Sequence, residues 1–381
     1  MDKKNKNPNV PNLRFSFEKN WCTSTIGENF KLSSGLTPST KEKVYFNNGI
    51  IPWINSGELK NKYISSTENR LTLNAVKKHN LTIYPKDTMV IAIYGLEAAG
   101  VRGKASITKM DSTISQSCMA LNSLGDVLTQ FMYYVYKKEA QILGTRYAQG
   151  TKQQNLSSDL ISSYKLHYPS KEEQLKIVDF LSLIDEKIET QIKIIDRLQS
   201  QIKYIKGQIL NLTTTIEIKS LDQLCDISTG KRDANEMKIN GMYKFFTCSR
   251  EDYCIDTYSF EGEALIISGN GELGLIKYYN GKFDAYQRTY VLQNFNCHPK
   301  YLMYVLQSKL PRKIEKEKNV GAMPYIVLKT LTSINVEIPN MHDQIEIVDI
   351  LNKFEEKLEN EQILLELFKK EKSFLLKNLF V

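Results

Sequence analysis

The sequence contains no run of about 18 apolar residues, so no segment is predicted to span a membrane. The N-terminal stretch MDKKNKNPNVPN is charged and lacks the apolar core of a secretory signal, which we therefore do not expect. The six cysteines include no Cys-x-x-Cys pair, and the four histidines show no metal-ligand spacing. We expect reduced, mostly buried thiols, no metal site and a cytoplasmic location.

Motifs for chemistry on DNA are also scarce. An adenine methyltransferase uses an Asn/Asp-Pro-Pro-Tyr/Phe loop, whereas the only Asn-Pro pair here is Asn7-Pro8. The stretch SGNGELG at 268–274 lacks the Gly-Lys-Ser/Thr end of a P-loop and no amphipathic helix follows it, so we predict a strand–turn–strand. We predict no catalytic residue and no cofactor bound by this chain. An Asp…Glu-x-Lys nuclease cluster is too degenerate a motif to decide from the sequence.

The overall charge is mildly basic. Lys and Arg number 51 against 43 Asp and Glu, which gives a net charge of +8. This excess is compatible with an anionic partner such as nucleic acid, but it does not identify one without a location. The charged share of 25% and the apolar share of 41% are ordinary for a soluble protein. A chain of 381 residues is expected to form two or more domains.

A heptad pattern dominates residues 169–212. Apolar residues that recur with a 3.5-residue period over more than four heptads predict a helix that supercoils against a partner. Pro169, Ser170 as N-cap and Glu173 three residues later predict the start of this helix with a capping box. Gln191 is the only polar residue among the ten a and d positions. These positions are Leu181, Ile184, Ile188, Gln191, Ile195, Leu198, Ile202, Ile205, Ile209 and Leu212.

This stretch is repeated 170 residues later, starting at Pro339. Aligned without gaps, Gln174 matches Gln344 and Leu181 matches Leu351. We predict that the two helices pair with each other and run antiparallel. The polar residues Gln191, Glu361 and Lys372 interrupt the seam, and they either fix the helix register or mark where other subunits bind. The second copy of the seam consists of Leu351, Phe354, Leu358, Leu365, Phe368, Leu375 and Leu379.

The segments that precede the two helices are also related. Residues 26–35 resemble 221–230, the apolar run 89–93 resembles 264–267, and the tyrosine-rich segment 131–135 resembles 301–305. We predict an α+β fold with two duplicated, mixed α/β domains separated by a long antiparallel two-helix coiled coil. A helix of 40 residues is about 60 Å long, which exceeds one turn of duplex DNA at about 34–36 Å. The predicted segments are a flexible arm at 1–20, head one at 21–168, helix one at 169–215, head two at 216–338 and helix two at 339–381.

On these features the chain resembles the DNA specificity subunits of type I restriction–modification systems. The resemblance covers nearly the whole chain and includes residues 26–39, the run IPWINSGEL at 51–59, and the helix starts at 169 and 339. It implies that each head is a target-recognition domain for one half of an asymmetric, bipartite DNA site. It also implies that the helices space the heads and dock two methyltransferase subunits, to which restriction subunits add. S-adenosylmethionine, ATP and Mg would then be bound by those partners.

Candidate DNA contacts lie beside glycine turns. Phosphates are bound by Arg and Lys, and bases are read by Arg, Gln and Asn. For each candidate the alternative is a solvated loop, or a half-buried core position in the case of Tyr94, and we expect Trp53 to be a core residue. The candidates are Tyr94, Arg102, Lys104, Lys152, Gln153 and Gln154 in head one, and Lys231, Arg232, Arg250, Gln287 and Arg288 in head two.

Two other functions stay open at this point. One is a self-sufficient DNA methyltransferase or nuclease with an internal duplication, which would bind S-adenosylmethionine or cleave DNA with a metal. The other is a structural coiled-coil protein without a nucleic-acid role, which would show no salt-dependent retention on duplex DNA.

Overall fold

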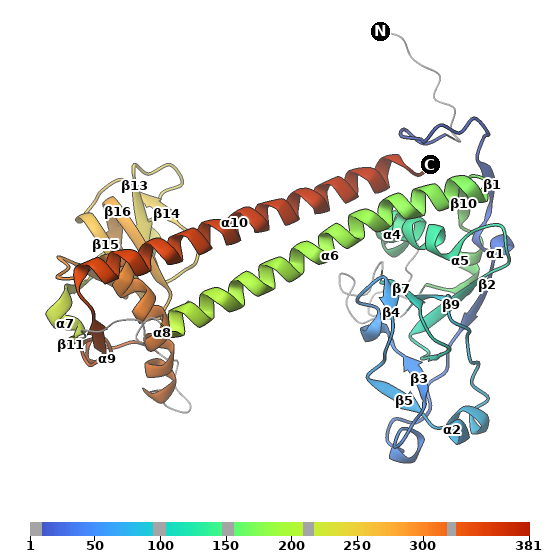
Figure 1. Cartoon of the computed structure of the whole chain (residues 1–381), viewed down its shortest axis with the longest axis horizontal. Helices are drawn as coiled ribbons and strands as arrows, with labels where there is room; N and C mark the ends of the chain where they lie inside the picture. The colour runs from blue at the N-terminus through green and yellow to red at the C-terminus, as the bar shows by residue number, and fades with distance from the viewer. Residues whose placement is uncertain (1–9, 94–103, 147–155, 209–216, 318–324) are drawn as a thin grey trace, which may run out of the picture. The chain divides into compact units, whose positions relative to one another are not determined.

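The structure, a computed structural model, describes residues 10–93, 104–146, 156–208, 217–317 and 325–381, with side chains described outside 140–146 (Figure 1). It divides into two compact units. Unit 1 comprises residues 1–190 and 365–381, and unit 2 comprises residues 191–364. Each unit therefore holds one head with parts of both long helices. Within the described residues, no helix is both long and apolar enough to cross a membrane.

Head one is built on a five-stranded sheet with the order β2-β9-β6-β7-β4 and a smaller sheet with the order β5-β3-β8. The β6 sequence MVIA is apolar throughout because both faces of the strand are covered. Met89 and Ile91 face the core that includes α4 and α6, whereas Val90 and Ala92 face a second core with Ile54. The strands are β1 Cys22–Thr25, β2 Phe30–Ser34, β3 Ile51–Ile54, β4 Tyr63–Ile64, β5 Asn69–Leu71, β6 Met89–Ala92, β7 Ala105–Thr108, β8 Thr113–Ile114, β9 Cys118–Ser123 and β10 Lys165–Tyr168. The helices are α1 Ile26–Asn29, α2 Leu73–Lys78, α4 Thr129–Arg146 and α5 Ser158–Ser162.

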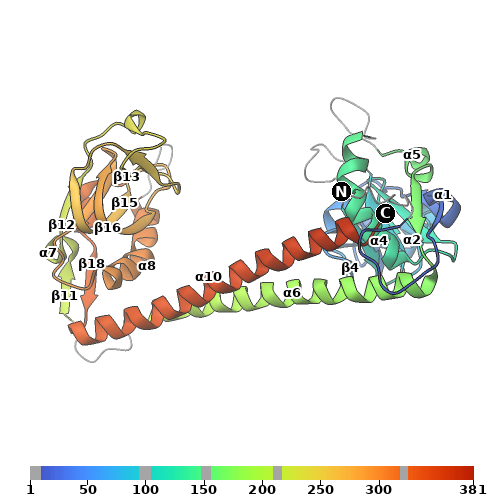
Figure 2. The same ribbon diagram turned by 90° about the horizontal axis from the view of Figure 1, so that it is seen from above.

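Head two has a six-stranded sheet with the order β12-β17-β15-β16-β13-β14. Leu265 and Ile267 of β15 pack toward α8, which lies against this sheet (Figure 2), and Ala264 and Ile266 face the opposite core. The strands are β11 Glu217–Ser220, β12 Asp226–Thr229, β13 Tyr243–Phe246, β14 Tyr253–Ile255, β15 Phe260–Ser268, β16 Ile276–Ala285, β17 Thr289–Gln293 and β18 Asn335–Ile338. The helices are α7 Leu221–Leu224, α8 Pro299–Glu317 and α9 Leu328–Thr332. The strand–turn–strand predicted around 268–274 is confirmed by the β15–β16 hairpin.

Strand pairing confirms that the two heads are copies of one fold. The order β2-β9-β6-β7 in head one corresponds to β12-β17-β15-β16 in head two. A parallel pair recurs in both heads: β3–β8 places Ile54 opposite Ile114 in head one, and β13–β16 places Phe246 opposite Ala285 in head two. Head one has a further parallel pair, β4–β7. The β1–β10 and β11–β18 pairs then close each head next to its long helix. Trp53 is buried in head one, as predicted.

The predicted long helices are α6 Lys171–Gln208 and α10 Met341–Asn378. Positions 209 and 212 of the predicted seam lie outside the described residues. The Ser170 hydroxyl accepts a hydrogen bond from the Glu173 N–H, as expected for an N-cap. The second half of the predicted capping box is wrong, because the Glu173 carboxylate instead accepts hydrogen bonds from Arg14 and Trp21. This almost fully buried carboxylate ties the segment before β1 to the start of α6.

The helices run antiparallel in both units. In unit 1, Asp185 of α6 pairs with Lys372 of α10 at 2.6 Å, and the Lys187 ammonium lies over the Phe368 ring. In unit 2, the Gln191 side chain donates hydrogen bonds to Glu361, and Lys206 pairs with Glu355 at 2.8 Å. The polar seam residues are therefore matched across the helix pair, which favours their role in fixing the register.

Burial follows the predicted heptads. On α6 the buried seam side chains are Leu181, Ile184, Gln191, Ile195, Leu198 and Ile202, with Ile188 and Ile205 partly buried. On α10 the buried seam side chains are Leu351 and Leu375, with Phe354, Leu358, Leu365 and Phe368 partly buried. Leu379, directly after the helix, is also buried. The a and d pattern therefore identified the contact face of both helices.

Equivalent side chains fasten each head to its long helix. The fully buried Gln174 accepts a hydrogen bond from the Leu128 N–H, and the buried Gln344 accepts one from the His298 N–H. Both amides also donate to the carbonyl of the proline five residues earlier. Tyr134 of α4 donates to Asp185 at 2.7 Å, and Tyr304 of α8 donates to Glu355 at 2.8 Å. The same set of contacts therefore fixes the head helix on the long helix in both copies.

Candidate nucleic-acid interface

Four segments of head two meet beside the β16–β17 turn. They are the residues after β12, the residues after β15, the turn Tyr286–Arg288, and the residues before α9. The Gly230 N–H donates to the Thr289 carbonyl, the Gly269 N–H to the Arg288 carbonyl, and the Ile326 N–H to the Gly269 carbonyl. A Cβ atom on Gly230 would lie 2.0 Å from the Ala285 carbonyl oxygen, so this approach requires glycine. Backbone hydrogen bonds therefore hold the four segments together.

A groove of about 580 Å³ lies among these segments. The side chains of Gln287 and Arg288 are exposed at its border and have no partner in the part of the chain that the structure describes. Tyr325 is 65% exposed, so an aromatic side chain is accessible beside this groove. An amide, a guanidinium and an aromatic ring beside one groove are the groups that bind nucleic acids. The remaining lining residues are Thr229, Gly269, Tyr290, Ile326, Val327 and Leu328.

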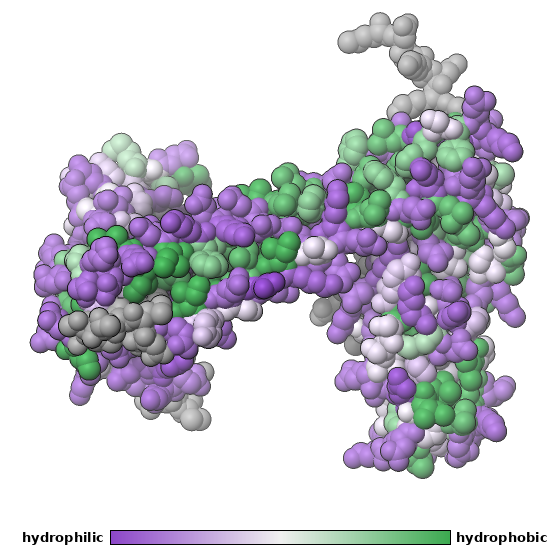
Figure 3. Space-filling view, in the orientation of Figure 1, coloured by the Kyte–Doolittle hydropathy of each residue, from purple (hydrophilic) through white to green (hydrophobic). Residues whose placement is uncertain are grey.

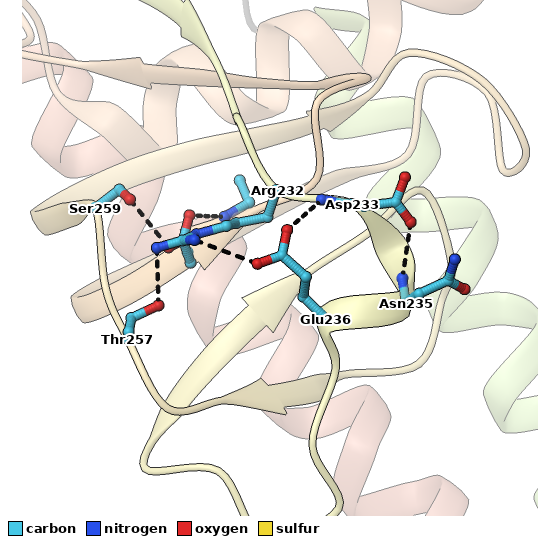
Figure 4. A network of polar contacts seen from close by, with 8 residues as sticks. Arg232, Asp233, Asn235, Glu236, Thr257 and Ser259 are labelled. Atoms are coloured by element: carbon cyan, nitrogen blue, oxygen red, sulfur yellow. Dashed lines mark hydrogen bonds and ion pairs between the residues drawn. The ribbon is translucent and has the colours of Figure 1, made fainter.

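Unlike Arg288, Arg232 lies within a network of polar contacts; Figure 4 shows this network. Its guanidinium donates to the fully buried Asp284 carboxylate at 3.1 Å, to Glu236 at 3.2 Å and to Thr257 at 3.1 Å. Asp284 also accepts a hydrogen bond from Ser259. These contacts raise the pKa of Arg232 above its ordinary value, chiefly through the hydrogen bond to Asp284. The arginine therefore anchors the segment after β12 to β16, and its DNA contact stays a prediction.

The other residues predicted to contact DNA differ in their exposure and in their side-chain partners. Arg250 pairs with Glu272 at 2.8 Å on the surface of head two. Lys231 is exposed, and Lys104 is partly buried just before β7; among the described residues neither has a recorded side-chain partner. Tyr94, Arg102, Lys152, Gln153 and Gln154 lie outside the described residues. The structure thus brings Lys231, Gln287 and Arg288 together near one turn and places Arg250 in an ion pair.

Head one contains a turn that the sequence prediction missed. Gln116 is exposed between β8 and β9, and its N–H donates to the Thr37 hydroxyl. Gly35 approaches this turn as Gly230 does in head two, because an added Cβ would lie 2.2 Å from the Ile114 carbonyl oxygen. The sequence signal for this turn was the match between Gly35 and Gly230 in the two heads. The predicted correspondence between the heads did not include the turn that faces each glycine.

The described residues offer no group of three or more His, Cys, Asp or Glu side chains suited to a metal. The six cysteines are free thiols. Burial raises the pKa of Cys118 to about 11 and the pKa of Cys225 and Cys297 to about 12. These three thiols therefore stay protonated at neutral pH and behave as core side chains.

Comparison with known proteins gives a consistent result. The family model of the type I restriction modification DNA specificity domain matches residues 18–200 and 214–368. The specificity subunit of the Escherichia coli type I restriction enzyme EcoDI is 35% identical over 38% of this chain and 32% of its own length. The MjaIX specificity subunit from Methanocaldococcus jannaschii is 32% identical over 46% of this chain and 40% of its own length. The chain thus spans about a third to two fifths of the length of these relatives.

A solved structure extends the likeness of fold to nearly the whole chain. The S subunit of a type I restriction–modification system from M. genitalium has a TM-score of 0.65 at 19% identity, covering 98% of this chain and 99% of that one. A second structure, from a study of complex assembly and conformational transition of the type I R-M system, has a TM-score of 0.60 at 13% identity. At these low sequence identities, the similarity is evidence for a shared fold alone.

Proposed function

The chain belongs to the type I restriction modification DNA specificity domain family, and from that premise we propose that it is a non-catalytic subunit that selects DNA sites for partner enzymes. Each head reads one half of an asymmetric, bipartite site. The five segments predicted from the sequence are the arm, the two target-recognition domains and the two spacer helices. Cofactors for methylation and cleavage, S-adenosylmethionine, ATP and Mg, belong to the partner subunits.

The observation that carries this proposal is the duplicated head with unlike residues at matching positions. The family model matches the chain twice, once for each head and its following helix. The strands pair in the same order in both heads. At the turn that follows the β3–β8 pair in head one and the β13–β16 pair in head two, head two presents Arg288, whereas head one has Ser117. Related folds with different contact residues are suited to two unlike half-sites on one duplex.

The long helices carry surfaces suited to partner subunits. Apolar side chains are exposed among polar ones along α6 and α10 (Figure 3). Such side chains are typical of protein interfaces. We propose that these surfaces dock two methyltransferase subunits, to which restriction subunits add. The exposed residues are Leu175, Leu183, Leu367 and Phe374 in unit 1, and Ile192, Ile194, Tyr204, Met341, Ile345, Ile350, Ile363 and Leu364 in unit 2.

Salt-dependent binding to duplex DNA tests the proposed function. We expect the chain, co-expressed with a methyltransferase subunit, to bind duplex DNA. The logarithm of its binding constant should fall linearly with the logarithm of the salt concentration, with a slope set by the number of phosphate contacts. Each lost phosphate contact should reduce that slope by about 0.9. Lys231→Ala is expected to reduce the slope in this way, because the ammonium is exposed beside the groove-forming segments.

The matched control is Lys219→Ala. Lys219 is partly exposed on β11 and pairs with Glu217, so its removal should leave the slope unchanged. Absence of salt-dependent retention by the wild-type complex would contradict DNA reading and favour a structural coiled-coil protein. Binding of S-adenosylmethionine or metal-dependent cleavage by the isolated chain would instead favour a self-sufficient enzyme.

A further inference from the structure

We propose that the turn of residues 115–118 in head one and the turn of residues 286–289 in head two are equivalent base-reading turns, in which Gln116 and Gln287 each read one base of a half-site. This inference rests on the proposed function and deepens it. It adds Gln116 to the DNA contacts predicted from the sequence. It also proposes that Gln287 contacts a base rather than a phosphate.

The equivalence follows from strand register. Ile114 lies opposite Ile54 in the parallel β3–β8 pair, and Ala285 lies opposite Phe246 in the parallel β13–β16 pair. Gln116 and Gln287 are each two residues beyond these positions. The next strand starts at Cys118 in head one and at Thr289 in head two, again at matching distances along the chain.

The backbone hydrogen bonds of the two turns also match. The Ser115 N–H donates to the Ile54 carbonyl at 2.8 Å, and the Tyr286 N–H donates to the Phe246 carbonyl at 2.9 Å. Each turn is then closed by a bond to the residue three positions earlier: from Cys118 to Ser115 at 3.0 Å, and from Thr289 to Tyr286 at 2.8 Å. Both turns are therefore four-residue β-turns, with glutamine at the second position.

A neighbouring glycine holds each turn in place. The Gly35 N–H donates to the Cys118 carbonyl at 3.2 Å, and the Gly230 N–H donates to the Thr289 carbonyl at 3.1 Å. Neither glycine leaves room for a Cβ atom next to the facing turn. A turn fixed from both sides presents its side chain without a large ordering cost on binding, which favours specific recognition.

The chemistry of glutamine favours a base over a phosphate. An amide presents a donor and an acceptor together and pairs with the N6 and N7 edge of adenine, whereas a phosphate offers acceptors only. Gln116 and Gln287 are exposed, and in the described part of the chain no side-chain partner competes for their amides. Both amides are therefore available for a base edge.

The third position of the turn distinguishes the two heads. Ser117 is engaged internally, since its hydroxyl bonds Ser115 at 2.7 Å and accepts from the Ser56 N–H at 3.3 Å. The exposed Arg288 guanidinium has no such engagement among the described residues. Arginine pairs with the O6 and N7 edge of guanine. Head two is therefore expected to read one more purine with this turn than head one does.

The test uses the full chain in complex with its methyltransferase subunit and duplex libraries randomised at each position of the target. Gln116→Ala is expected to reduce discrimination about 5- to 150-fold at one base pair of one half-site, and Gln287→Ala to do so in the other half-site. Arg288→Ala should relax a further position in the same half-site as Gln287→Ala. Gln201→Ala, which removes an exposed glutamine of α6, is the matched control and should change none of these positions.

The outcomes separate this inference from the proposed function. If the wild-type complex selects two half-sites but Gln116→Ala and Gln287→Ala leave all preferences unchanged, the base-reading turns are refuted while the proposed function stands. An equal loss of affinity for every sequence would identify phosphate contacts and also overturn the inference. If the wild-type complex shows no sequence preference, the proposed function itself fails. Thermal unfolding of each variant excludes loss of the fold as the cause.

Discussion

Replacing Leu181 with alanine is expected to lower the free energy of unfolding by about 2–5 kcal/mol. Leu181 is fully buried in the core where α6, α4 and the end of α10 meet. Truncation removes apolar contacts and leaves a cavity in a close-packed region. The equivalent residue Leu351 is also fully buried, in the core of unit 2, and Leu351→Ala should cost a similar amount there.

Leu183→Ala is the control for this experiment. Leu183 lies two residues further along α6 and is 57% exposed, so its truncation should change stability by less than about 0.5 kcal/mol. Urea unfolding followed by circular dichroism measures the three variants against the wild type. Equal losses for Leu181→Ala and Leu183→Ala would show that the heptad seam does not determine the stability of the helix pair.

The second large effect is expected for Asp284→Asn, with a loss of about 2–4 kcal/mol in the free energy of unfolding. The Asp284 carboxylate is fully buried and accepts hydrogen bonds from Arg232 and Ser259. An amide of the same size removes the negative charge and leaves a single acceptor oxygen for three donors, which are Arg232, Ser259 and the Ala285 N–H. The segment after β12 should then be held to β16 less tightly, mainly by its backbone hydrogen bonds.

Asp256→Asn provides the matched control in the same head. Asp256 is exposed and has no recorded side-chain partner among the described residues, so the same chemical change should be nearly neutral. Chemical denaturation of both variants measures the difference, and DNA binding by the intact complex reports on the groove. Wild-type stability for Asp284→Asn would show that the Arg232 network contributes nothing to the fold of head two.

Local periodicity made the helices and the duplication predictable. The a and d residues from Leu181 to Ile205 face the partner helix, because a 3.5-residue period specifies one contact face. The sequence predicted that Gln191 and Glu361 each interrupt an apolar seam, but it did not predict that the two side chains pair. The geometry of that pairing required knowing that the two helices meet antiparallel at those residues.

Contacts between distant residues limited the prediction of the site. Glu173 satisfied the local rule for a capping box, but Arg14, 159 residues away in sequence, binds its carboxylate. Arg232 follows Gly230-Lys231 and Arg288 follows Gln287, both in loops. The contacts of Arg232 with Asp284, Glu236 and Thr257 distinguish the two environments. Gln116 was missed because its significance comes from a strand pairing that the sequence does not display.

The measurement that most directly tests the central claim is a map of methylated adenines in the genome of a host that carries this chain with its methyltransferase subunit. Two different half-sites separated by a spacer of fixed length are expected, since each head presents its own contact residues. Exchange of head two for that of a relative should change one half-site and leave the other unchanged. A single uninterrupted motif, or a palindromic one, would contradict the reading of one half-site by each head.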